Sequence, residues 1–464
     1  MAALITAFAA ALAQPPHLVV VSLDTTRADA LSCDGKPPVP FHDATPQLPR
    51  TPVLDAIAAQ GVRFEQFYAH APSTLSSHAS MFTGKDPHQH GVVRNGYPLD
   101  AELTTLAQRL ATAGYDTRAV LGAAALESGT GIERGFAVYD DESPTLRGLM
   151  YQAPADEVVT RALASADSRA PDKPLFLFVH FFDAHSPYEP PAPFAQRYAV
   201  PGYDGAFSNP EQLLRPLVQA LRKGSAYEPA VAAVNGRYLG EIGWVDSQVG
   251  VLIAGLEQRG ILDEDALLVI VGDHGEVLSE DAIFAWTHGN NISEGVLRVP
   301  LLLKSWGSVA LAERRVVSRQ APMSQLAPTI ERLLGLQTTL GTDFWELVRP
   351  GPVLDVGAWP ESGQRPVFME ATRPRQFEST DRWNNLPLAR GVLAGGFRLE
   401  ADPAHEVAPH MAAGHPLALA PELDRLLLRW DEAATEHRTA DMPEHTRRAL
   451  EALGYLTDDP PPDP

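Results

Sequence analysis

The sequence predicts an α/β protein built on a doubly wound, mainly parallel sheet. Four largely apolar runs have the composition of strands that are covered on both faces, namely residues 17–23, 116–122, 174–182 and 267–272. Amphipathic stretches of helical period lie between them, each followed by a glycine, at residues 51–60, 103–113 and 238–259. Strands that alternate with helices in this way predict parallel crossover units.

The chain after about residue 335 has a different pattern, which predicts a second, smaller α+β domain. Residues 367–371 and 388–399 read as short antiparallel strands with a Gly-Gly turn, whereas residues 423–430 and 446–453 read as helices. The final acidic and proline-rich residues have the composition of a disordered tail. We therefore expect a catalytic domain at 15–345, a C-terminal α+β subdomain at 346–456 and the tail at 457–464.

Residues 187–227 are rich in Pro, Gly and Tyr, and their periodicity is weak. We expect them to form a long excursion near the site rather than a separate domain.

The first 14 residues contain an apolar run that ends in Ala-Leu-Ala, the pattern of a short signal peptide, although no Lys or Arg precedes it. This favours a periplasmic or secreted protein, and a cytoplasmic protein with a frayed terminus is the alternative. The run is too short to cross a bilayer, so we expect no integral membrane segment.

The composition restricts the class of ligand. The 464 residues include 58 acidic and 37 basic ones, for a formal charge of −21. Such a surface repels phosphate backbones, so no nucleic-acid partner is expected, and solubility is the plainest role of the charge. The only cysteine, Cys33, excludes an intramolecular disulfide and a cysteine-rich zinc site.

Polar residues follow three of the predicted strands where each strand ends. They are Asp24, then Asp183 with His185, then Asp273 with His274. Ligands of open α/β sheets bind at the carboxyl ends of the strands. One Asp after a strand is more often a helix cap, but three carboxylates and two histidines at one edge favour a divalent cation. A cation would also supply the positive charge that an acidic protein needs to bind an anionic ester.

Residues 71–92 form a hydroxyl-rich stretch that leads into a probable helix start. Such a loop can supply a nucleophile and, through its backbone N–H groups, an anion site. Ser and Thr clusters also cap helices without any catalytic role.

Within this stretch, residues 74–84 resemble the segment C/S-x-P-S-R-x-x-x-x-T-G of the sulfatases, a branch of the alkaline-phosphatase superfamily. The alignment places Thr74 at the nucleophile, Ser76 at the proline, Ser77 at the serine and His78 at the arginine. Other family-like text is DTTRADALSCDG from Asp24, FFDAHSPYEPP from Phe181, GDHGE from Gly272 and THGNNISEGVLRVPLLL from Thr287. The resemblance spans nearly the whole chain. It implies an α/β/α sandwich with a large mixed, mainly parallel sheet and a small C-terminal domain.

The resemblance also implies roles for individual residues. Asp24, Asp273 and His274 match metal ligands, and Thr74 completes the shell as the metal-bound nucleophile. His185 and His288 match catalytic histidines that contact the transferred group or a second metal, with a structural histidine as the alternative. The substrate-binding set adds His78 and Asp183, although Asp183 could instead only orient His185. Four further residues lie in segments that resemble the family, and each either takes part in the site or only supports the loop. They are Arg27, Lys85, His88 and His90.

The sequence departs from the sulfatase pattern at several positions. Threonine at Thr74 cannot be oxidised to the formylglycine of sulfatases, His78 replaces the arginine, and Thr25 replaces the second aspartate. Residues 121–126 read LGAAAL where a lysine–histidine pair is expected. These losses remove positive charge that holds a sulfate monoester. A Thr nucleophile with an Asp-His pair is similar to the phosphoethanolamine and lipoteichoic-acid transferases of the superfamily.

We therefore expect a metal-dependent hydrolase of sulfate or phosphate esters, with phosphate mono- or diesters favoured. Its substrate would be a small molecule or a glycan or lipid ester, and its cofactor one or two divalent ions (Zn, Mn, Mg or Ca). His274 in place of an asparagine favours the first three ions. The alternatives are a transferase of a phosphoryl-linked head group, whose relatives usually carry transmembrane helices, and a non-catalytic homologue that binds anionic glycans. The sequence predicts no particular oligomeric state.

Overall fold

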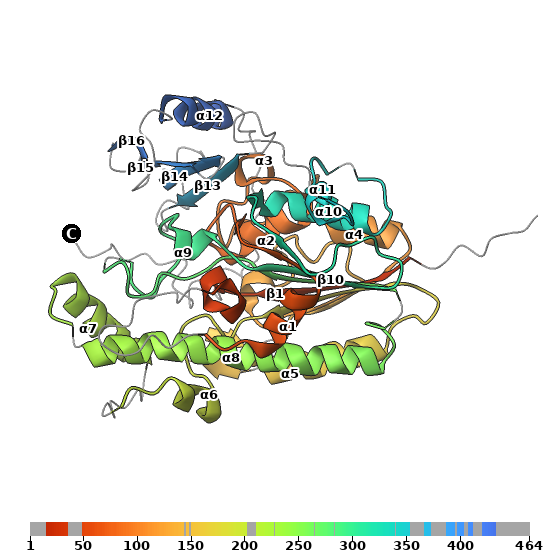
Figure 1. The fold of residues 1–464 in the computed structure, drawn as a ribbon, viewed down its shortest axis with the longest axis horizontal. Coiled ribbons are helices and arrows are strands. Elements are labelled where there is room, and N and C mark those ends of the chain that lie inside the picture. Colours follow the sequence, from red (N-terminus) through yellow and green to blue (C-terminus); the bar gives the residue numbers. More distant parts are fainter. Residues whose placement is uncertain are drawn as a thin grey trace, which may run out of the picture.

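The computed structural model describes residues 15–35, 49–142, 145–147, 150–201, 210–226, 228–263, 265–282, 284–338, 340–352, 366–372, 387–394, 397–402, 407–411 and 420–432. Two helical layers enclose a central sheet, and a smaller sheet with one helix lies next to α3 (Pro87–His90) (Figure 1). This arrangement confirms the predicted α/β/α sandwich with a small C-terminal domain.

The central sheet has eight strands in the order β11-β2-β10-β9-β1-β8-β4-β5. The four predicted strands are confirmed as β1, β4, β8 and β9, each within two residues of its expected bounds. The strands, in sheet order, are β11 (Arg315–Val317), β2 (Val62–Phe64), β10 (Leu301–Trp306), β9 (Ala266–Gly272), β1 (His17–Leu23), β8 (Leu175–Phe181), β4 (Asp116–Val120) and β5 (Val138–Asp140).

The sheet is buried on both faces, which explains why its central strands are continuous apolar runs. In β1, Leu18 and Val20 join one apolar core, and Val19, Val21 and Leu23 join the other. The first core includes α2 (Thr74–Thr83), α4 (Leu106–Thr112), α10 (Leu326–Leu333) and α11 (Trp345–Val348). The second includes α1 (Pro52–Gln60), α5 (Ala155–Asp167) and α8 (Glu228–Gln258), and Figure 1 shows these helices on the opposite side of the sheet.

Strand β10 runs antiparallel to both of its neighbours, β9 and β2. The loop from β9 to β10 therefore starts and ends at the same edge of the sheet and needs no crossover helix. This loop contains His274 and His288 and the short helix α9 (Glu294–Leu297). Strand direction thus keeps two predicted site residues beside the ends of β1 and β8.

Helix α8 begins ten residues before the expected start at Tyr238. Gly236 weakens the helical signal there, because glycine is a poor helix former. In the fold, a side chain at that position would meet the backbone oxygen of Tyr198 at 2.7 Å, so the glycine allows close packing. Tertiary contact therefore extends the helix beyond its sequence pattern.

The expected excursion at 187–227 contains two helices, α6 (Ala192–Arg197) and α7 (Pro210–Arg222). Helix α7 contains Pro216, a residue that disfavours a helix interior. Leu217, Val218 and Leu221 of α7 pack against an apolar cluster that includes Tyr188 and Tyr238. Across the described ranges, no helix combines the length and apolar character needed to cross a membrane.

The C-terminal domain is a four-stranded antiparallel sheet with a helix packed on it. Its elements are β13 (Val367–Thr372), β14 (Pro387–Ala394), β15 (Phe397–Asp402), β16 (Val407–Met411) and α12 (Ala420–Glu432). The predicted signal peptide at 1–14, helix at 446–453 and tail at 457–464 lie outside the described residues. Export and the exact domain bounds therefore stay predictions.

The remaining elements are short. They are α3 (Pro87–His90), the strand pairs β3 (Phe67–Tyr68) with β12 (Ala321–Pro322) and β6 (Thr145–Arg147) with β7 (Met150–Gln152), and the 3₁₀ turns η1 (Ala28–Ala30), η2 (Ser32–Asp34), η3 (Ala124–Leu126) and η4 (Met323–Gln325).

The side chain of Asp246, in α8, caps the N-terminus of helix α1. We expect this buried carboxyl to make the stability of the fold depend on pH. Its carboxylate accepts hydrogen bonds from Leu54 N at 2.8 Å and Val53 N at 3.3 Å. Burial nevertheless raises the pKa of Asp246 to about 6. A carboxyl whose pKa rises on folding stabilises the fold most below about pH 4, and that contribution is lost as the pH rises through 6.

We expect Asp246→Asn to gain about 1–3 kcal/mol of unfolding free energy relative to wild type between pH 4 and pH 7. Urea unfolding of both proteins at the two pH values measures this difference. Any constant effect of the altered hydrogen bonds cancels in the comparison. A difference that does not change with pH would show that the carboxyl has its ordinary pKa in the fold.

Candidate active site

The site lies at the carboxyl ends of three adjacent strands, β9, β1 and β8. Asp24 directly follows β1 and Asp273 directly follows β9, and both side chains are buried. The structure brings together four predicted metal-site residues from distant parts of the chain, Asp24, Thr74, Asp273 and His274.

Thr74 is the first residue of α2 and is fully buried. Its hydroxyl donates a hydrogen bond to Oδ2 of Asp24 at 3.3 Å and lies 3.4 Å from Nε2 of His274. The neighbouring hydroxyls face elsewhere, because Ser76 donates to Val92 O at 2.5 Å and Ser77 to Asp273 O at 2.6 Å. Thr74 thus holds its hydroxyl at a helix N-terminus, where N–H groups favour an anion.

The two carboxylates and His274 fit a divalent cation. One ligand atom from each of Asp24, Asp273 and His274 lies within 4.8 Å of the others. Oδ1 of Asp24 and Oδ2 of Asp273 are buried without a hydrogen-bond partner among the described residues. Burial raises the pKa of both carboxyls, because the contacts in the protein do not offset the loss of hydration of the charged carboxylates. Two carboxylate oxygens, an imidazole and a hydroxyl are a suitable ligand set for Zn, Mn or Mg.

A strained turn holds the two carboxylates together. Thr25 has a φ of 46°, in the left-handed region that β-branched residues avoid. The turn directs the Thr25 N–H to Oδ1 of Asp273 at 3.1 Å, and the same oxygen accepts from His274 N at 2.7 Å. Tyr238 donates its hydroxyl to Thr25 O at 2.9 Å. At the position of the family's second aspartate, this chain therefore uses a backbone N–H to orient Asp273.

His274 and His185 present Nε2 as their acceptor nitrogen. Nδ1 of His274 donates to Gly275 O at 2.9 Å, and Nδ1 of His185 donates to Ser186 O at 2.6 Å. A carbonyl can only accept, so in the neutral ring Nε2 carries the lone pair. Burial lowers the pKa of His185 to about 4. Burial also lowers the pKa of His274, but the charges of Asp273 and Asp24 outweigh this effect and raise it.

His288 lies between the other two histidines and is held by Glu276, a residue that the sequence interpretation did not assign. Its ring centre is 4.6 Å from that of His274 and 4.8 Å from that of His185. Nδ1 of His288 lies 3.4 Å from Oε1 of the buried Glu276, whose Oε2 accepts from Tyr188 at 3.0 Å. Burial raises the pKa of Glu276 to about 7 and lowers that of His288 well below its ordinary value. Glu276 thereby connects the loops that carry His288 and Tyr188.

His78 lies below Thr74 in the buried layer. Its Nδ1 donates to Thr74 O at 2.7 Å, and its Nε2 lies 2.9 Å from Oγ of Ser22. His78, His180 and Asp273 form a second cluster with ligand atoms within 4.8 Å. Because both nitrogens of His78 are already hydrogen-bonded, this cluster is a weaker metal candidate than the one at Asp24. A substrate contact for His78 stays a prediction.

The contacts of Asp183 indicate a structural role, which is to join neighbouring elements. Its Oδ1 accepts from Ala155 N, at the start of α5, and from Trp244 Nε1, each at 3.1 Å. It thereby joins the end of β8 to α5 and α8. Its assignment to substrate binding stays a prediction.

The four family-like residues outside the ligand set have contacts of their own. Arg27 is buried and pairs with Asp29 and Glu280. His90 lies 2.9 Å from Ser80 Oγ, His88 packs on Trp430 of α12, and half-buried Lys85 lines a hollow beside β13. Their contacts support the loops around α2, and any further part in the site stays a prediction.

Asn95 is a second residue that the sequence interpretation missed. Its Oδ1 accepts from Leu75 N at 2.7 Å, which caps the helix that begins at Thr74. The side chain is 1% exposed, and its Nδ2 has no partner within the described part of the chain. A buried amide donor next to the candidate nucleophile is a suitable group for an oxygen of an anionic ester. In the sequence, Asn95-Gly96 reads only as a turn.

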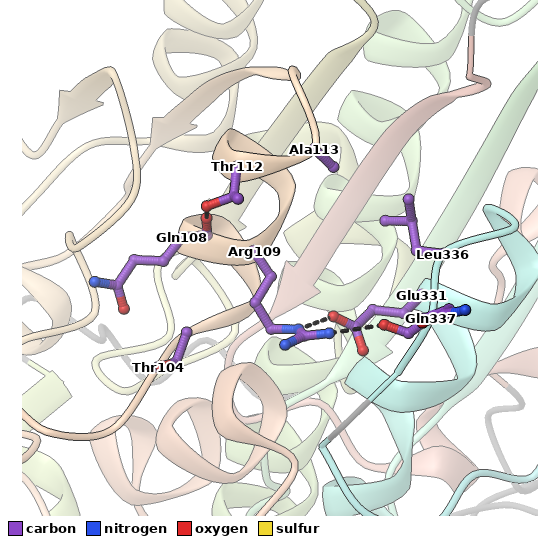
Figure 2. Close-up of a pocket in the computed structure, with 8 residues that line it drawn as sticks. All are labelled: Thr104, Gln108, Arg109, Thr112, Ala113, Glu331, Leu336 and Gln337. Carbon is purple, nitrogen blue, oxygen red and sulfur yellow. Dashed lines mark hydrogen bonds and ion pairs between the residues drawn. The ribbon is translucent and has the colours of Figure 1, made fainter.

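A hollow of about 480 Å³ lies between α4 and α10, and none of the predicted site residues lines it. Figure 2 shows that Arg109 in this hollow pairs with Glu331 and donates to Gln337 O, at 2.9 Å. The guanidinium is thus already paired with a buried carboxylate. This hollow is therefore a weaker candidate for binding an anionic ester than the sheet edge where Asp24 lies.

The model of the Sulfatase family matches residues 16–336. The chain is 24% identical over 371 residues to an arylsulfatase of Clostridium perfringens, covering 68% of this chain and 74% of that protein. It is 21% identical over 401 residues to a multifunctional alkaline phosphatase superfamily protein of Trinickia caryophylli, covering 70% and 75%.

Solved structures show the same fold. The phosphonate monoester hydrolase of Agrobacterium radiobacter superposes with a TM-score of 0.63 and 20% identity, covering 95% of this chain and 96% of that one. A protein solved in complex with its substrate D-glucosamine-2-N,6-O-disulfate gives a TM-score of 0.67 at 17% identity, covering 90% and 98%.

Proposed function

The chain belongs to the sulfatase family, and from its site we propose that it is a metal-dependent hydrolase of sulfate or phosphate esters whose nucleophile is Thr74. One observation carries the proposal. The Thr74 hydroxyl lies at the start of α2 within 3.4 Å of both Asp24 and His274, beside carboxylate oxygens that lack hydrogen-bond partners among the described residues. The relatives' activities on sulfate and phosphonate esters agree with this class of reaction.

Asp24, Asp273 and His274 would hold the cation together with Thr74. When bound, a divalent ion supplies the charge that lowers the pKa of a hydroxyl and balances the oxygens of an anionic ester. The protein side of the site is preorganised for this, since backbone N–H groups fix Asp273 and Nδ1 of His274 is tied to a carbonyl. Such outer contacts typically set ligand orientation.

The reaction proceeds in two displacements. The Thr74 hydroxyl gives up its proton to solvent, and its oxygen forms a bond to phosphorus or sulfur while the bond to the leaving oxygen breaks. The leaving oxygen takes a proton from solvent in return. Water then attacks the Thr74 ester and the Thr74 oxygen takes up a proton again. The product released is sulfate, phosphate or, from a diester, a phosphate monoester. Burial keeps His185 and His288 neutral, so we assign them to accept the proton of this water or to ligate a second ion.

The chemistry of Thr74 favours phosphorus over sulfur. A threonine cannot supply the aldehyde hydrate that sulfatases use, and His78, at the position of the family's arginine, is hydrogen-bonded to Thr74 O and Ser22. A loose phosphoryl transition state depends mainly on positioning and charge stabilisation. Phosphate mono- or diesters of a small molecule, glycan or lipid are therefore the proposed substrates.

A panel of p-nitrophenyl sulfate, phosphate, phosphodiester and phosphonate monoester tests this proposal. The metal-stripped protein is assayed with each ester after Zn, Mn, Mg or Ca is added back. We expect turnover of a phosphorus ester that requires added metal. A clear preference for the sulfate would contradict the argument from threonine, and binding of metal without turnover of any ester would favour a non-catalytic homologue.

Two variants of Asn95 separate a capping role from a role in turnover. Asn95→Ala loses both the acceptor for Leu75 N and the free amide donor, so we expect a loss of about 1 kcal/mol in stability and a fall of about 10²-fold in kcat. Asn95→Asp keeps the acceptor but loses the donor. It should recover the stability and not the turnover, as measured by urea unfolding and by steady-state kinetics. Wild-type kcat in Asn95→Asp would limit Asn95 to capping.

A further inference from the structure

His180 lies beneath the site in a strand that otherwise presents only apolar side chains. It is the penultimate residue of β8, pairs in register with Ser22 of β1, and is fully buried. It shares its face of the sheet with Phe178, whose ring packs against Phe82 of α2 at 5.1 Å. Its Nε2 is 3.1 Å from Oδ2 of Asp24.

The two oxygens of Asp24 have different surroundings. Oδ2 faces both His180 Nε2 at 3.1 Å and the Thr74 hydroxyl at 3.3 Å. Oδ1 has no hydrogen-bond partner in the described residues. An ionised carboxylate can only accept, so His180 must carry its proton on Nε2.

We propose that His180 is a positioning residue that holds Oδ2 of Asp24 and thereby leaves Oδ1 for the cation. The inference rests on the proposed function, since it takes Asp24 as a metal ligand. Ligating carboxylates are usually hydrogen-bonded by such outer partners. The Thr74 hydroxyl cannot fill this role throughout the reaction, because it loses its proton when it attacks. His180 is then the donor that remains on Oδ2.

Direct ligation by His180 agrees less well with the contacts. Its Nε2 is directed at a carboxylate oxygen, and Nδ1 is buried with no partner among the described residues. His78, which belongs to the same cluster of possible ligands, has its ring centre 5.3 Å away and both nitrogens engaged. His180 therefore differs from His274, which faces Thr74 with its acceptor nitrogen.

Metal affinity of the full-length protein tests this role without relying on activity. His180→Gln places an amide donor at about the reach of Nε2, whereas His180→Leu fills a similar space without a donor. Ser22→Ala is the matched control, because it removes a buried polar group from the same layer without touching Asp24. Zn and Mn dissociation constants are measured by chelator competition, and thermal unfolding of the metal-free proteins is recorded in parallel.

We expect His180→Leu to bind metal about 10- to 100-fold more weakly than wild type. His180→Gln and Ser22→Ala should remain within about threefold of wild type, because each keeps a donor on Oδ2. Wild-type affinity in His180→Leu would overturn the positioning role, and so would equal losses in the Gln and Leu variants, which indicate direct ligation.

A further variant keeps the test decisive if His180→Leu does not fold. The amide of His180→Asn is too short to reach Asp24 but retains a polar group, so its affinity should fall while that of His180→Gln does not. Equal affinity of these two variants would overturn the inference. Failure of the wild-type protein to bind any divalent ion is a different result, which would refute the proposed function itself.

Discussion

We expect Thr74→Ala to lower kcat/KM for every ester that the wild-type protein hydrolyses, by about 10³-fold or more, because the proposed reaction then lacks its attacking oxygen. The loss should fall on kcat, since Asp24, Asp273 and His274 remain to hold the cation. Thr74 is fully buried, and truncating it should cost about 1 kcal/mol of stability, too little to unfold the protein.

Thr74→Ser is the matched control for this prediction. It keeps the hydroxyl that faces Asp24 and His274 and loses only a methyl group, so part of the turnover should remain. Steady-state kinetics, metal content and thermal unfolding are compared for the three proteins. If Thr74→Ala turns over any ester at the wild-type rate, Thr74 is not the nucleophile for that ester.

Asp273→Asn should remove metal binding and leave the fold intact. Its Oδ1 can still accept from Thr25 N and His274 N, so the turn at the site is preserved. The amide replaces Oδ2, which has no hydrogen-bond partner in the described residues, and it removes a negative charge. We expect metal affinity to fall at least 10²-fold and kcat/KM by about 10³-fold, because a neutral amide is a poor ligand for these ions.

In the metal-free protein, by contrast, we expect Asp273→Asn to stabilise the fold. Burial raises the pKa of Asp273, so its charged form opposes folding at neutral pH. Metal-free Asp273→Asn should therefore be at least as stable as metal-free wild type at pH 7, and its advantage should shrink as the pH falls from 7 towards 4. Asp246→Asn serves as the control that alters a buried carboxyl elsewhere and leaves metal affinity unchanged. Wild-type metal affinity in Asp273→Asn would remove Asp273 from the ligand set.

The parts of the site that the sequence predicted are those tied to strand ends. Asp24 and Asp273 could be placed because an apolar run ends immediately before each one, and parallel strands end at one edge. The fold class followed from the same runs. Thr74 required the family-like segment as well, because a hydroxyl cluster alone also fits a helix cap.

The residues that were missed act through contacts that no local pattern encodes. His180 sits in an apolar strand, where a single histidine reads as core, and only the register with Ser22 places it below Asp24. Asn95 reads as part of a turn, yet its side chain reaches Leu75 N on another element. The direction of β10 was also not evident, since an apolar run does not reveal whether its partners are parallel.

The pairing of β1 has a consequence for synthesis on the ribosome. Leu18 pairs with Phe176 on one side and with Leu267 on the other, so β1, the first of the described strands, waits for two partners that are made much later. At ordinary rates of translation the wait for β9 is roughly 10–50 s. Until then the edge of β1 that pairs with β9 has no partner, and unpaired strand edges of this kind are prone to aggregation. A nascent chain that stops before β9 should therefore fail to retain the cation, although it already carries Asp24 and Thr74.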